Sequence, residues 1–435
     1  MSATLGIRHE DKYLMECRTP LTPYHVKKLI EKYGLEIIVE KSDKRVFLDQ
    51  EYKEAGAKVE NNLKNSQVIF GVKEIPEQKF ENNKTYIFFS HVIKGQPYNM
   101  PMLKRMMEMN CNLIDYERIV DEQNRRLIFF GKFAGLAGMI NSIWSLGERL
   151  KKYGYDTPFL KIKQSYKYNS LDEAKREIAK VGQQIAEEGL PGELCPLTIG
   201  FTGYGNVSVG AQEIASFLPI KEILPEELLK LRERKNIPNN VLYKVIFKEE
   251  HLSARNDGSS FDLQDYYKNP DKYHSVFEKY IPHLTVLMNC MYWDERYPRI
   301  VTKDYLQKLF EKGRPKLTVI GDITCDPDGS VEITHKGTPI EDPVFVYNPS
   351  TRKPKPGFDG EGMLVMAVDI LPSELPRDSS IAFADALMDF VKPIADANFS
   401  ESFDNIKLPH PIKKALILLN GKLTPEYKYI ESYLK

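Results

Sequence analysis

The chain has 435 residues, which is more than one hydrophobic core usually serves, so we expect two or three domains. Basic and acidic residues both number 61, and this balance excludes the strong net field that draws proteins to nucleic acid or to anionic membranes. The cysteines show no metal-ligand spacing, which predicts a reducing compartment and no metal site. They are Cys17, Cys111, Cys195, Cys290 and Cys325.

Neither the N-terminus nor the most apolar segment has the pattern of a membrane or targeting signal. Residues 1–13 contain acidic side chains and no apolar stretch, so we expect neither a secretory signal nor a transit peptide. The apolar window 127–147 is interrupted by Lys132 and Asn141 and is rich in glycine, which predicts a buried helix rather than a membrane span. These features predict a cytoplasmic protein, with the mitochondrial matrix as the alternative if the chain is part of a processed protein.

The first part of the chain alternates between strand-like and helical segments. A helix is expected over 22–34, with Thr22 as its N-cap, Pro23 at its first position and Gly34 just past its end. Alternation of this kind is typical of a parallel sheet with helical crossovers. Strands are expected at 3–8, 35–40, 66–72 and 85–90.

The pattern starts again near residue 196 and predicts a second, doubly wound sheet. A loop rich in Pro, Gly and basic residues covers 346–362, and a helix expected at 381–394 returns to the first domain. Strands are expected at 197–202, 220–224, 242–247, 284–289 and 316–323. The fold class predicted is therefore α/β, with two Rossmann-like domains, parallel sheets and an interdomain active-site cleft. The predicted substrate domain covers 1–135 plus 345–435, and the predicted dinucleotide-binding domain covers 136–344.

A glycine-rich turn joins the first strand of the second sheet to the helix that follows. Gly203 and Gly205 occupy the first two positions of the dinucleotide-binding pattern G-x-G-x-x-G, whereas Ser208 holds the third. Because serine is small, it still allows close helix packing, and we expect the loop to cradle a pyrophosphate. The alternative is a glycine-rich turn with no ligand. The predicted coenzyme contacts in the loop are Gly203, Gly205, Asn206, Val207 and Ser208.

The type of coenzyme depends on the second strand of this sheet. An acidic residue at its tip would hold the adenosine ribose of NAD, but the expected strand ends at Leu224, with no carboxylate at the tip itself. Nothing there repels a 2′-phosphate, so the pattern favours NADPH over NADH. The alternative for the charged residues that follow, 226–234, is an ordinary solvated helix face.

Polar residues follow successive strands of the first sheet, where the carboxyl ends of the strands meet. A lysine directly after a buried strand can lose its proton more readily through desolvation, and histidine titrates near neutrality, so Lys73 and His91 suit acid/base chemistry. Arginines nearby could bind a carboxylate in bidentate fashion. The simpler alternatives are that Lys73 reaches solvent, that His91 caps the next segment, and that Arg18 pairs with Glu16.

The residues so far carry a resemblance to the lysine–ketoglutarate reductase family. This family comprises the lysine-forming saccharopine dehydrogenases, including the N-terminal half of the bifunctional α-aminoadipic semialdehyde synthases. The resemblance runs nearly from end to end of the chain. It rests on 7-IRHEDKYLMECRTPLTP-23, 72-VKEIP-76, 88-FFSHVIKGQ-96, 114-IDYERIVDEQNRR-126, 134-AGLAGMIN-141, 203-GYGNVSVGAQ-212, 292-YWDERYPRIVT-302, 322-DITCDPDGSVE-332 and 419-LNGKLTPEYKYI-430.

The resemblance implies an alanine dehydrogenase-like fold and the reductive condensation of L-lysine with 2-oxoglutarate to saccharopine, with NADPH as hydride donor in the bifunctional branch. It assigns acid/base roles to Lys73 and His91. It also places a loop containing Ile370 and Leu371 near the nicotinamide. The substrate contacts that it implies are Glu16, Arg18, Glu74, Gln96, Glu117, Arg126 and Asp326.

Two other functions stay open at this stage. One is a different amino-acid dehydrogenase of the alanine dehydrogenase type, and the other is a nucleotide-sensing module without catalysis. Lys73, His91 and Arg18 together argue against the second. A glutamate-forming saccharopine dehydrogenase domain is the expected partner, either fused or associated.

Overall fold

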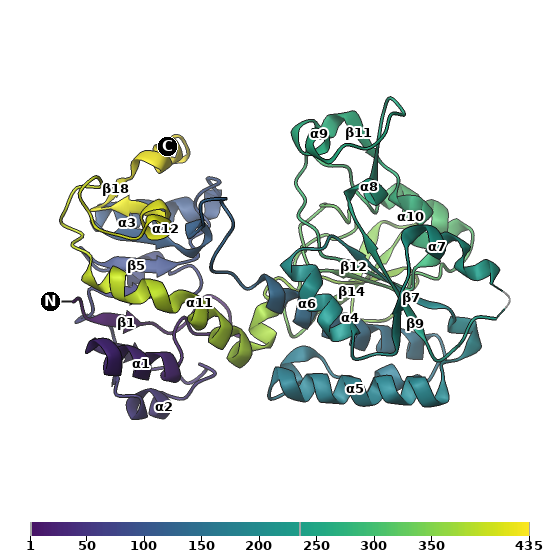
Figure 1. Ribbon diagram of the computed structural model, residues 1–435, viewed down its shortest axis with the longest axis horizontal. Coiled ribbons are helices and arrows are strands. Elements are labelled where there is room, and N and C mark those ends of the chain that lie inside the picture. The colour runs from purple at the N-terminus through teal and green to yellow at the C-terminus, as the bar shows by residue number, and fades with distance from the viewer. Residues whose placement is uncertain (1, 235, 435) are drawn as a thin grey trace. The chain divides into compact units, whose positions relative to one another are not determined.

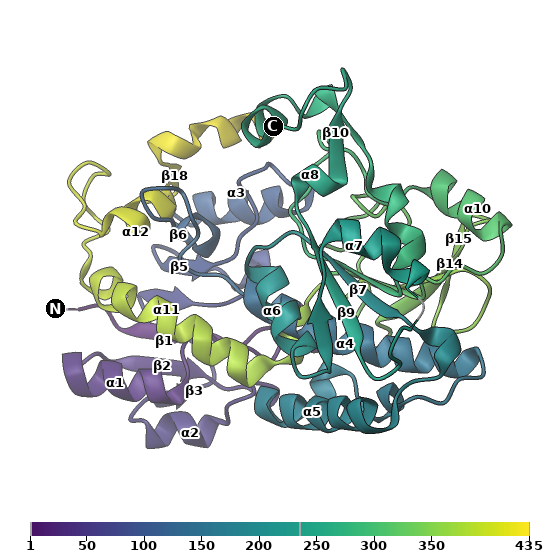
Figure 2. The same cartoon turned by 45° about the vertical axis from the view of Figure 1, so that its right-hand side comes forward.

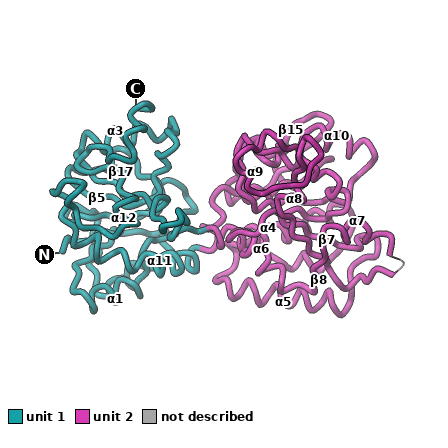
Figure 3. The backbone as a smooth tube through the Cα atoms, turned by 45° about the horizontal axis from the view of Figure 1, so that its top comes forward, with its two compact units in different colours: residues 1–130, 376–435 teal, residues 131–375 magenta. Residues whose placement is uncertain are grey.

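The computed structural model describes residues 2–234 and 236–434, which form two compact units. Unit 1 comprises residues 1–130 and 376–435, and unit 2 comprises residues 131–375 (Figure 3). Residues 345–375, which the sequence analysis assigned to the first domain, lie in unit 2 because strands formed by this segment pair with the second sheet. Helix α11, Pro376–Asp396, belongs to unit 1, as expected of the C-terminal helices.

Unit 1 is built on an eight-stranded sheet with the order β18-β17-β6-β5-β4-β1-β2-β3. The six strands from β6 to β3 are parallel, whereas β17 and β18 add an antiparallel edge. The strands are β1 Leu5–Ile7, β2 Ile37–Glu40, β3 Lys58–Glu60, β4 Val68–Phe70, β5 Thr85–Phe88, β6 Asn112–Asp115, β17 Leu416–Leu419 and β18 Lys422–Leu423. All carboxyl ends of the parallel strands therefore lie at one edge.

Alternate residues of these strands face opposite sides of the sheet and are buried by helices on both. Ile7 and Phe70 pack in a cluster with α1 and α11, whereas Ile69 and Phe88 pack on the other face with α3 and the C-terminal 3₁₀ segment (Figure 2). The remaining helices of unit 1 are α1 Pro23–Tyr33, α2 Asp49–Glu54, α3 Met100–Glu108 and α12 His410–Ala415, and the 3₁₀ segment is Pro425–Tyr433.

Helix α1 begins and ends at the predicted residues. Pro23 is the first helical residue, and Gly34 ends the helix with φ of 63°, a left-handed conformation that glycine adopts without strain. Thr22 stands at the N-cap, but its hydroxyl is hydrogen-bonded to His25 Nδ1 (2.7 Å) rather than to a backbone N–H of the helix.

Unit 2 contains a second eight-stranded sheet, with the order β15-β14-β16-β13-β12-β7-β9-β8. The strands from β16 to β8 are parallel, and Figure 1 labels β7, β9 and β12 among them. Strands β14 and β15 form an antiparallel hairpin at the edge (Figure 2). The strands are β7 Leu197–Thr202, β8 Ile220–Glu222, β9 Leu242–Phe247, β12 Val286–Asn289, β13 Val319–Asp322, β14 Val344–Asn348, β15 Lys353–Pro356 and β16 Met363–Met366. A separate small hairpin is formed by β10 Ser253–Arg255 and β11 Tyr273–Ser275.

Two expectations for unit 2 need correction. Residues 346–362 were expected to be an exposed loop, but they contain most of the β14–β15 hairpin. Burial of Phe345 and Tyr347 holds β14 in the sheet, although its partner strand β15 contains two prolines. The second strand of the sheet in chain order, β8, ends at Glu222 rather than Leu224 and lies at the edge. The strands beside β7 are β9 and β12.

Helix α4, Gly131–Lys152, is the buried helix predicted from the apolar window. It packs on the sheet and crosses α6, Asn206–Ala215, at unusually close range (Figure 2). A Cβ atom on Gly135 would lie 1.9 Å from the Val207 carbonyl oxygen, and one on Gly210 would lie 2.1 Å from the Lys132 carbonyl oxygen. Only glycine fits at these two positions. Gly210 therefore provides the close helix contact, and the buried Ser208 instead hydrogen-bonds Gln212 (3.0 Å).

The other helices of unit 2 complete the two layers around the sheet. They are α5 Leu171–Glu188, α7 Pro225–Lys230, α8 Glu249–Leu252, α9 Leu263–Lys268 and α10 Lys303–Glu311. Among the residues that the model describes, no helix combines the length and the apolar character needed to cross a bilayer.

Candidate active site

The carboxyl edge of the unit 1 sheet gathers charged side chains from the segments that follow β1, β4 and β5. Glu10 follows β1 and is buried, and its two carboxylate oxygens accept hydrogen bonds from the backbone N–H groups of Val72 (2.8 Å) and Lys73 (2.9 Å). Burial raises the pKa of Glu10 above its ordinary value. This carboxylate fixes the backbone at the point where β4 ends, and thus the place from which Lys73 emerges.

His91 and Glu74 form the central contact of this edge. His91 Nδ1 lies 2.8 Å from Glu74 Oε1, and Lys12 Nζ lies 2.7 Å from the same oxygen. Burial acts to raise the pKa of Glu74, but the hydrogen bonds and charges of His91 and Lys12 outweigh it and lower the pKa to about 2. Glu74 is therefore a carboxylate at neutral pH and fixes the orientation of the imidazole through Nδ1.

The backbone at His91 also has an uncommon conformation. Its φ of 49° lies in the left-handed region, where non-glycine residues are infrequent, and its ring stacks on Phe89 with an interplanar angle of 16°. Asn99 donates a hydrogen bond to its carbonyl oxygen (3.2 Å). Conformations of this kind persist where the surrounding contacts determine them, and they often occur at functional sites.

Lys73 is half-buried and follows shortly after β4, and its Nζ lies 5.9 Å from the centre of the Tyr13 ring. Since Glu74 binds His91, the structure brings the Lys73–Glu74 segment and His91 together, as the sequence predicted for the ends of neighbouring parallel strands. Their catalytic roles stay predictions.

Arg18 and Glu16 form a buried ion pair. Arg18 Nε and Nη2 donate to the two oxygens of Glu16 at 2.7 and 2.6 Å, and the guanidinium lies 4.1 Å from the centre of the Phe130 ring. The simpler alternative of the sequence analysis is therefore observed. A substrate carboxylate at Arg18 would have to compete with Glu16 for these two donors.

Three other predicted contacts lie toward the rim of this edge. Arg126 is half-exposed and pairs with Glu117. The backbone N–H of Glu117 donates to Asp115 (2.8 Å), whose pKa burial raises to about 6. The side chain of Gln96 accepts a hydrogen bond from the backbone N–H of Lys94 (3.2 Å), and Gln96 precedes a 3₁₀ turn. This side chain therefore stabilises its own loop.

Several buried polar atoms at the same edge have no hydrogen-bond partner among the described residues. They are Nη1 of Arg8, Oδ1 of Asp11 and Oε2 of Glu74. Buried polar groups are nearly always satisfied, so this arrangement is suited to a polar ligand or ordered water. The sequence analysis did not single out Arg8, Glu10 and Lys12, although Arg8 directly follows a buried strand.

The glycine loop of unit 2 has the geometry of a phosphate-binding turn. Gly203 has φ of 80°, and a Cβ there would lie 3.2 Å from Met291 Cα, whereas a Cβ on Gly205 would meet no atom within 4 Å. Helix α6 begins directly after Gly205 without a side-chain cap, which leaves the N–H groups of its first turn to a ligand or water. These residues fit the pyrophosphate of a dinucleotide.

A cavity of about 410 Å³ lies beside this loop, at the carboxyl ends of β7, β9 and β12. Glu249 lines it and accepts a hydrogen bond from the Tyr267 hydroxyl (2.7 Å), and the Tyr204 hydroxyl lies 3.3 Å from its second oxygen. Glu249 follows the end of β9 closely, and β9 is one of the strands beside β7. It thus has the position that the sequence analysis sought at Leu224.

A second cavity, of about 840 Å³, continues past Glu249 to the edge strand. Its charged lining is mainly acidic and consists of Glu222, Glu226, Glu249 and Glu250, with Lys248 and His251. Hence the premise that no carboxylate stands at a strand tip is wrong: the structure places Glu249 after β9 and Glu222 at the end of β8. The sequence analysis considered only the region of Leu224, whereas the structure places β9, and not β8, beside β7.

The remaining predicted residues are distributed along the carboxyl edge of unit 2. Asp326 is exposed in the loop after β13, while Asp322 is buried and accepts hydrogen bonds from Asn289 (2.8 Å) and Thr324 (2.7 Å). Ile370 and Leu371 are buried after β16, where Leu371 approaches α4 at Gly138. Neither of them lines the two cavities beside the glycine loop.

No group of three or more potential metal ligands occurs within residues 2–234 and 236–434, and the five cysteines are free. The two edges thus present titratable side chains in unit 1 and the glycine loop with its neighbouring cavities in unit 2.

Comparison with known proteins agrees with this geometry. The model of the alanine dehydrogenase/PNT N-terminal domain matches residues 6–137, and that of the C-terminal domain matches residues 272–426. The solved structure of an L-alanine dehydrogenase superposes with a TM-score of 0.63 at 18% identity, covering 99% of this chain and 100% of the other. The chain belongs to the alanine dehydrogenase/PNT family.

Individual proteins with similar sequences indicate a narrower group than the two domain models do. Alpha-aminoadipic semialdehyde synthase of Arabidopsis thaliana is 40% identical over 99% of the chain, and the mitochondrial enzyme of Mus musculus is 34% identical over 98%. The chain spans less than half the length of these relatives, 41% and 47% respectively. A saccharopine dehydrogenase [NAD(+), L-lysine-forming] of Yarrowia lipolytica is 28% identical, covering 88% of this chain and 90% of its own. The resemblance to this branch, predicted from the motifs, is confirmed.

Proposed function

We propose that the chain is a lysine–ketoglutarate reductase, which condenses L-lysine with 2-oxoglutarate and reduces the product to saccharopine. The observation that carries this proposal is the His91–Glu74 contact beside Lys73 at the carboxyl edge of unit 1. It provides an oriented imidazole and a lysine in a chain whose relatives include lysine-forming saccharopine dehydrogenases.

The reaction requires several proton transfers, and the groups at this edge are suited to them. The substrate ε-amine must lose a proton before it attacks the ketone, the carbinolamine must lose water, and the resulting imine must be protonated. We assign these transfers to Lys73 and to His91, whose imidazole Glu74 orients through Nδ1. Because Glu74 stays ionised, it stabilises the protonated imidazole.

Binding of the two substrate carboxylates of 2-oxoglutarate needs cations at the same edge. Arg18 was predicted for this role, but its pairing with Glu16 leaves it less available. Arg8, which pairs with Asp11 at 3.0 Å and has its buried Nη1 without a partner among the described residues, is a better candidate for one carboxylate. Arg126 at the rim is the candidate for the other.

The coenzyme, a nicotinamide dinucleotide, supplies the hydride when it is bound. Gly203, Gly205 and the first turn of α6 would hold its pyrophosphate, and Glu249 would face the ribose of its adenosine half. NADPH is our proposal, from the resemblance to the bifunctional branch. The carboxylates around Glu249 favour the alternative, NADH, since a 2′-phosphate would meet their negative charge.

A steady-state assay tests both parts of the proposal. Oxidation of NADPH and of NADH is followed by absorbance with lysine and 2-oxoglutarate present, and then with each omitted in turn. Turnover that needs both substrates supports the proposal. Turnover with pyruvate and ammonia alone would indicate an alanine dehydrogenase instead, and coenzyme binding without any turnover would indicate a sensing module.

The Glu249→Gln variant addresses the choice of coenzyme. If Glu249 binds the ribose hydroxyls, the variant loses affinity for NADH by about tenfold and gains relative affinity for NADPH. If the ratio of the two affinities does not change, Glu249 has no part in the choice.

Two further features of the proposal concern the setting of the enzyme. We propose that it works together with a glutamate-forming saccharopine dehydrogenase, as a domain or as a partner, because the relatives of greatest identity reported above are about twice as long. We also propose a reducing compartment, such as the cytoplasm or the mitochondrial matrix, which is consistent with five free cysteines.

A further inference from the structure

A cavity of about 390 Å³ lies at the amino edge of the unit 2 sheet, opposite to the glycine loop. It opens where three neighbouring strands begin, since Thr285 and Thr318 directly precede β12 and β13, and Cys195 lies shortly before β7. None of the residues predicted for the reaction or the coenzyme lines it. The proposed function leaves this cavity unexplained.

The charged lining of the cavity is predominantly basic. Arg232, Arg314, Lys312 and Lys316 line it, and Glu193 is its single carboxylate. None of the four cations forms an ion pair with a carboxylate in the part of the chain that the model describes. By contrast, most basic side chains described above, such as Arg18 and Arg126, have an acidic partner.

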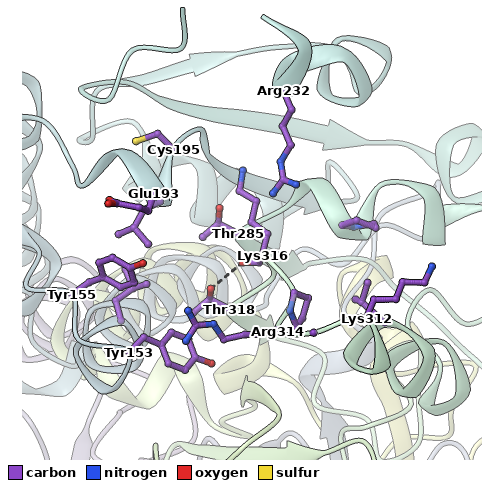
Figure 4. A pocket seen from close by; sticks show the side chains of 16 residues that line it. Tyr153, Tyr155, Glu193, Cys195, Arg232, Thr285, Lys312, Arg314, Lys316 and Thr318 are labelled. Atoms are coloured by element: carbon purple, nitrogen blue, oxygen red, sulfur yellow. Dashed lines mark hydrogen bonds between the residues drawn. The ribbon is translucent and has the colours of Figure 1, made fainter. Parts of the chain in front are cut away.

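The cations converge from separate elements. Lys316 extends from the loop after α10, and Arg232 extends toward it from the 3₁₀ turn Leu231–Glu233 that follows α7, whereas Lys312 points away toward the rim (Figure 4). The guanidinium of Arg314 lies 4.2 Å from the centre of the Tyr153 ring, which holds it on the wall of the cavity.

The free protein maintains this cluster at an electrostatic cost. Lys316 is half-buried, and its ammonium donates to the Pro196 carbonyl oxygen, with no ion-pair partner among the described residues. Burial and the neighbouring charge of Arg232 lower the pKa of Lys316 to about 7. A bound anion would remove both penalties, because it would pair with the two cations at once.

From the convergence of Arg232, Arg314 and Lys316 on one cavity without acidic partners, we propose that this cavity is a binding site for a small multivalent anion. The chemistry it recognises is that of a phosphate or carboxylate group. The Thr285 and Thr318 side chains, which also line the cavity, and the rings of Tyr153 and Tyr155 can contact the rest of the molecule.

Isothermal titration calorimetry on the full chain tests the proposal, with inorganic phosphate and citrate as separate probes in a buffer free of other multivalent anions. We expect one saturable site, with affinity reduced by about tenfold or more in Arg232→Ala and in Lys316→Met. Lys308→Ala removes an exposed lysine of α10 that does not line the cavity and serves as the matched control. If just one of the two probes binds, the result shows whether the site recognises a phosphate or a carboxylate group.

The coenzyme loop is a competing anion site, so the titrations are repeated in Gly205→Val. Binding that persists there and is weakened in Arg232→Ala belongs to the basic cavity. The proposal is overturned if neither anion binds, or if both variants bind as tightly as the unaltered chain. Because Arg232 is exposed, its replacement leaves the core intact, and a melting curve verifies this.

The pH dependence of binding provides a second test, with sulfate as a probe whose charge is constant between pH 6 and 9. An anion favours protonated Lys316, so affinity is expected to fall as the pH rises through about 7. The other ionisable groups that line the cavity are Arg232, Arg314, Lys312, Glu193, Cys195, Tyr153 and Tyr155. His283 is not part of the lining, but it lies close enough for the charges of Arg232 and Lys316 to add to burial in lowering its pKa. An equal decline in Lys316→Met would show that another of these groups is responsible and would refute the role of Lys316.

Discussion

The carboxyl edges of the two sheets differ in what they present to a ligand. At the edge of unit 1, buried charges contact one another, as in the pairs Arg18–Glu16 and His91–Glu74. At the edge of unit 2, the glycine loop presents backbone N–H groups and a cavity. The same strand arrangement thus presents charged side chains in one unit and backbone groups in the other.

This difference predicts different responses to mutation. In unit 1 each charged group compensates another, so the loss of one leaves a partner buried and unpaired. In unit 2 the glycine loop has no side chains at Gly203 and Gly205. We therefore expect a substitution that adds a side chain there to weaken coenzyme binding. The following four substitutions examine this contrast.

The largest effect is expected for Arg18→Ala, which leaves Glu16 buried without its partner. We expect a loss of about 3 to 5 kcal/mol in the free energy of unfolding. Urea unfolding followed by circular dichroism measures it. In the double variant Arg18→Ala with Glu16→Ala, most of the loss should be recovered. If the single variant is as stable as the original and only requires more 2-oxoglutarate, Arg18 is a substrate clamp after all.

Lys73→Met is expected to lower turnover by about a hundredfold, because it removes a proton-transfer group and leaves the coenzyme site unaltered. The measurement is the steady-state rate at saturating substrates, with coenzyme affinity from a fluorescence titration as the control. Unchanged turnover would remove Lys73 from the mechanism.

Gly205→Val introduces a side chain where a Cβ atom now meets nothing within 4 Å. The added atoms occupy the space of the pyrophosphate, so we expect coenzyme affinity to fall by about tenfold or more without a loss of stability. Titration of the coenzyme measures the affinity. Normal affinity in this variant would contradict the assignment of the loop.

Glu74→Gln is expected to have the smallest effect, about 1 kcal/mol, and the effect should depend on pH. The pKa of Glu74 is lowered on folding from 4.5 to about 2, so its ionised form stabilises the native state above pH 4.5. That contribution is lost as the pH falls through about 2. The melting temperatures of the variant and the original chain should therefore converge between pH 5 and pH 2, and a constant difference would disprove the role of the charge.

The sequence predicted local features of the fold well. The ends of α1 and the turn at Gly203 follow from patterns within a few residues, as do most parallel strands, whereas the antiparallel edge strands β14, β15, β17 and β18 were not predicted. The clustering of Glu74 and His91 also followed, because the carboxyl ends of adjacent parallel strands meet at one edge.

Strand order was not predictable in the same way. The position of β9 beside β7 depends on where distant crossover helices pack, so the sequence analysis looked for a carboxylate near Leu224 and did not consider Glu249. Likewise, the pairing of Arg18 with Glu16 depends on the path of an irregular loop, which no periodicity encodes. Lys316 was missed because its significance arises only when Arg232, far away in sequence, lies beside it.

The contact between Gly135 and Gly210 has a mechanical consequence. With backbone against backbone, there is no flexible side chain between α4 and α6 to absorb a displacement. Any shift of the first turns of α4, which start at the boundary between the two units, is thus transmitted to the helix whose N-terminus follows Gly205. We therefore expect α4 and the turn at Gly205 to move together.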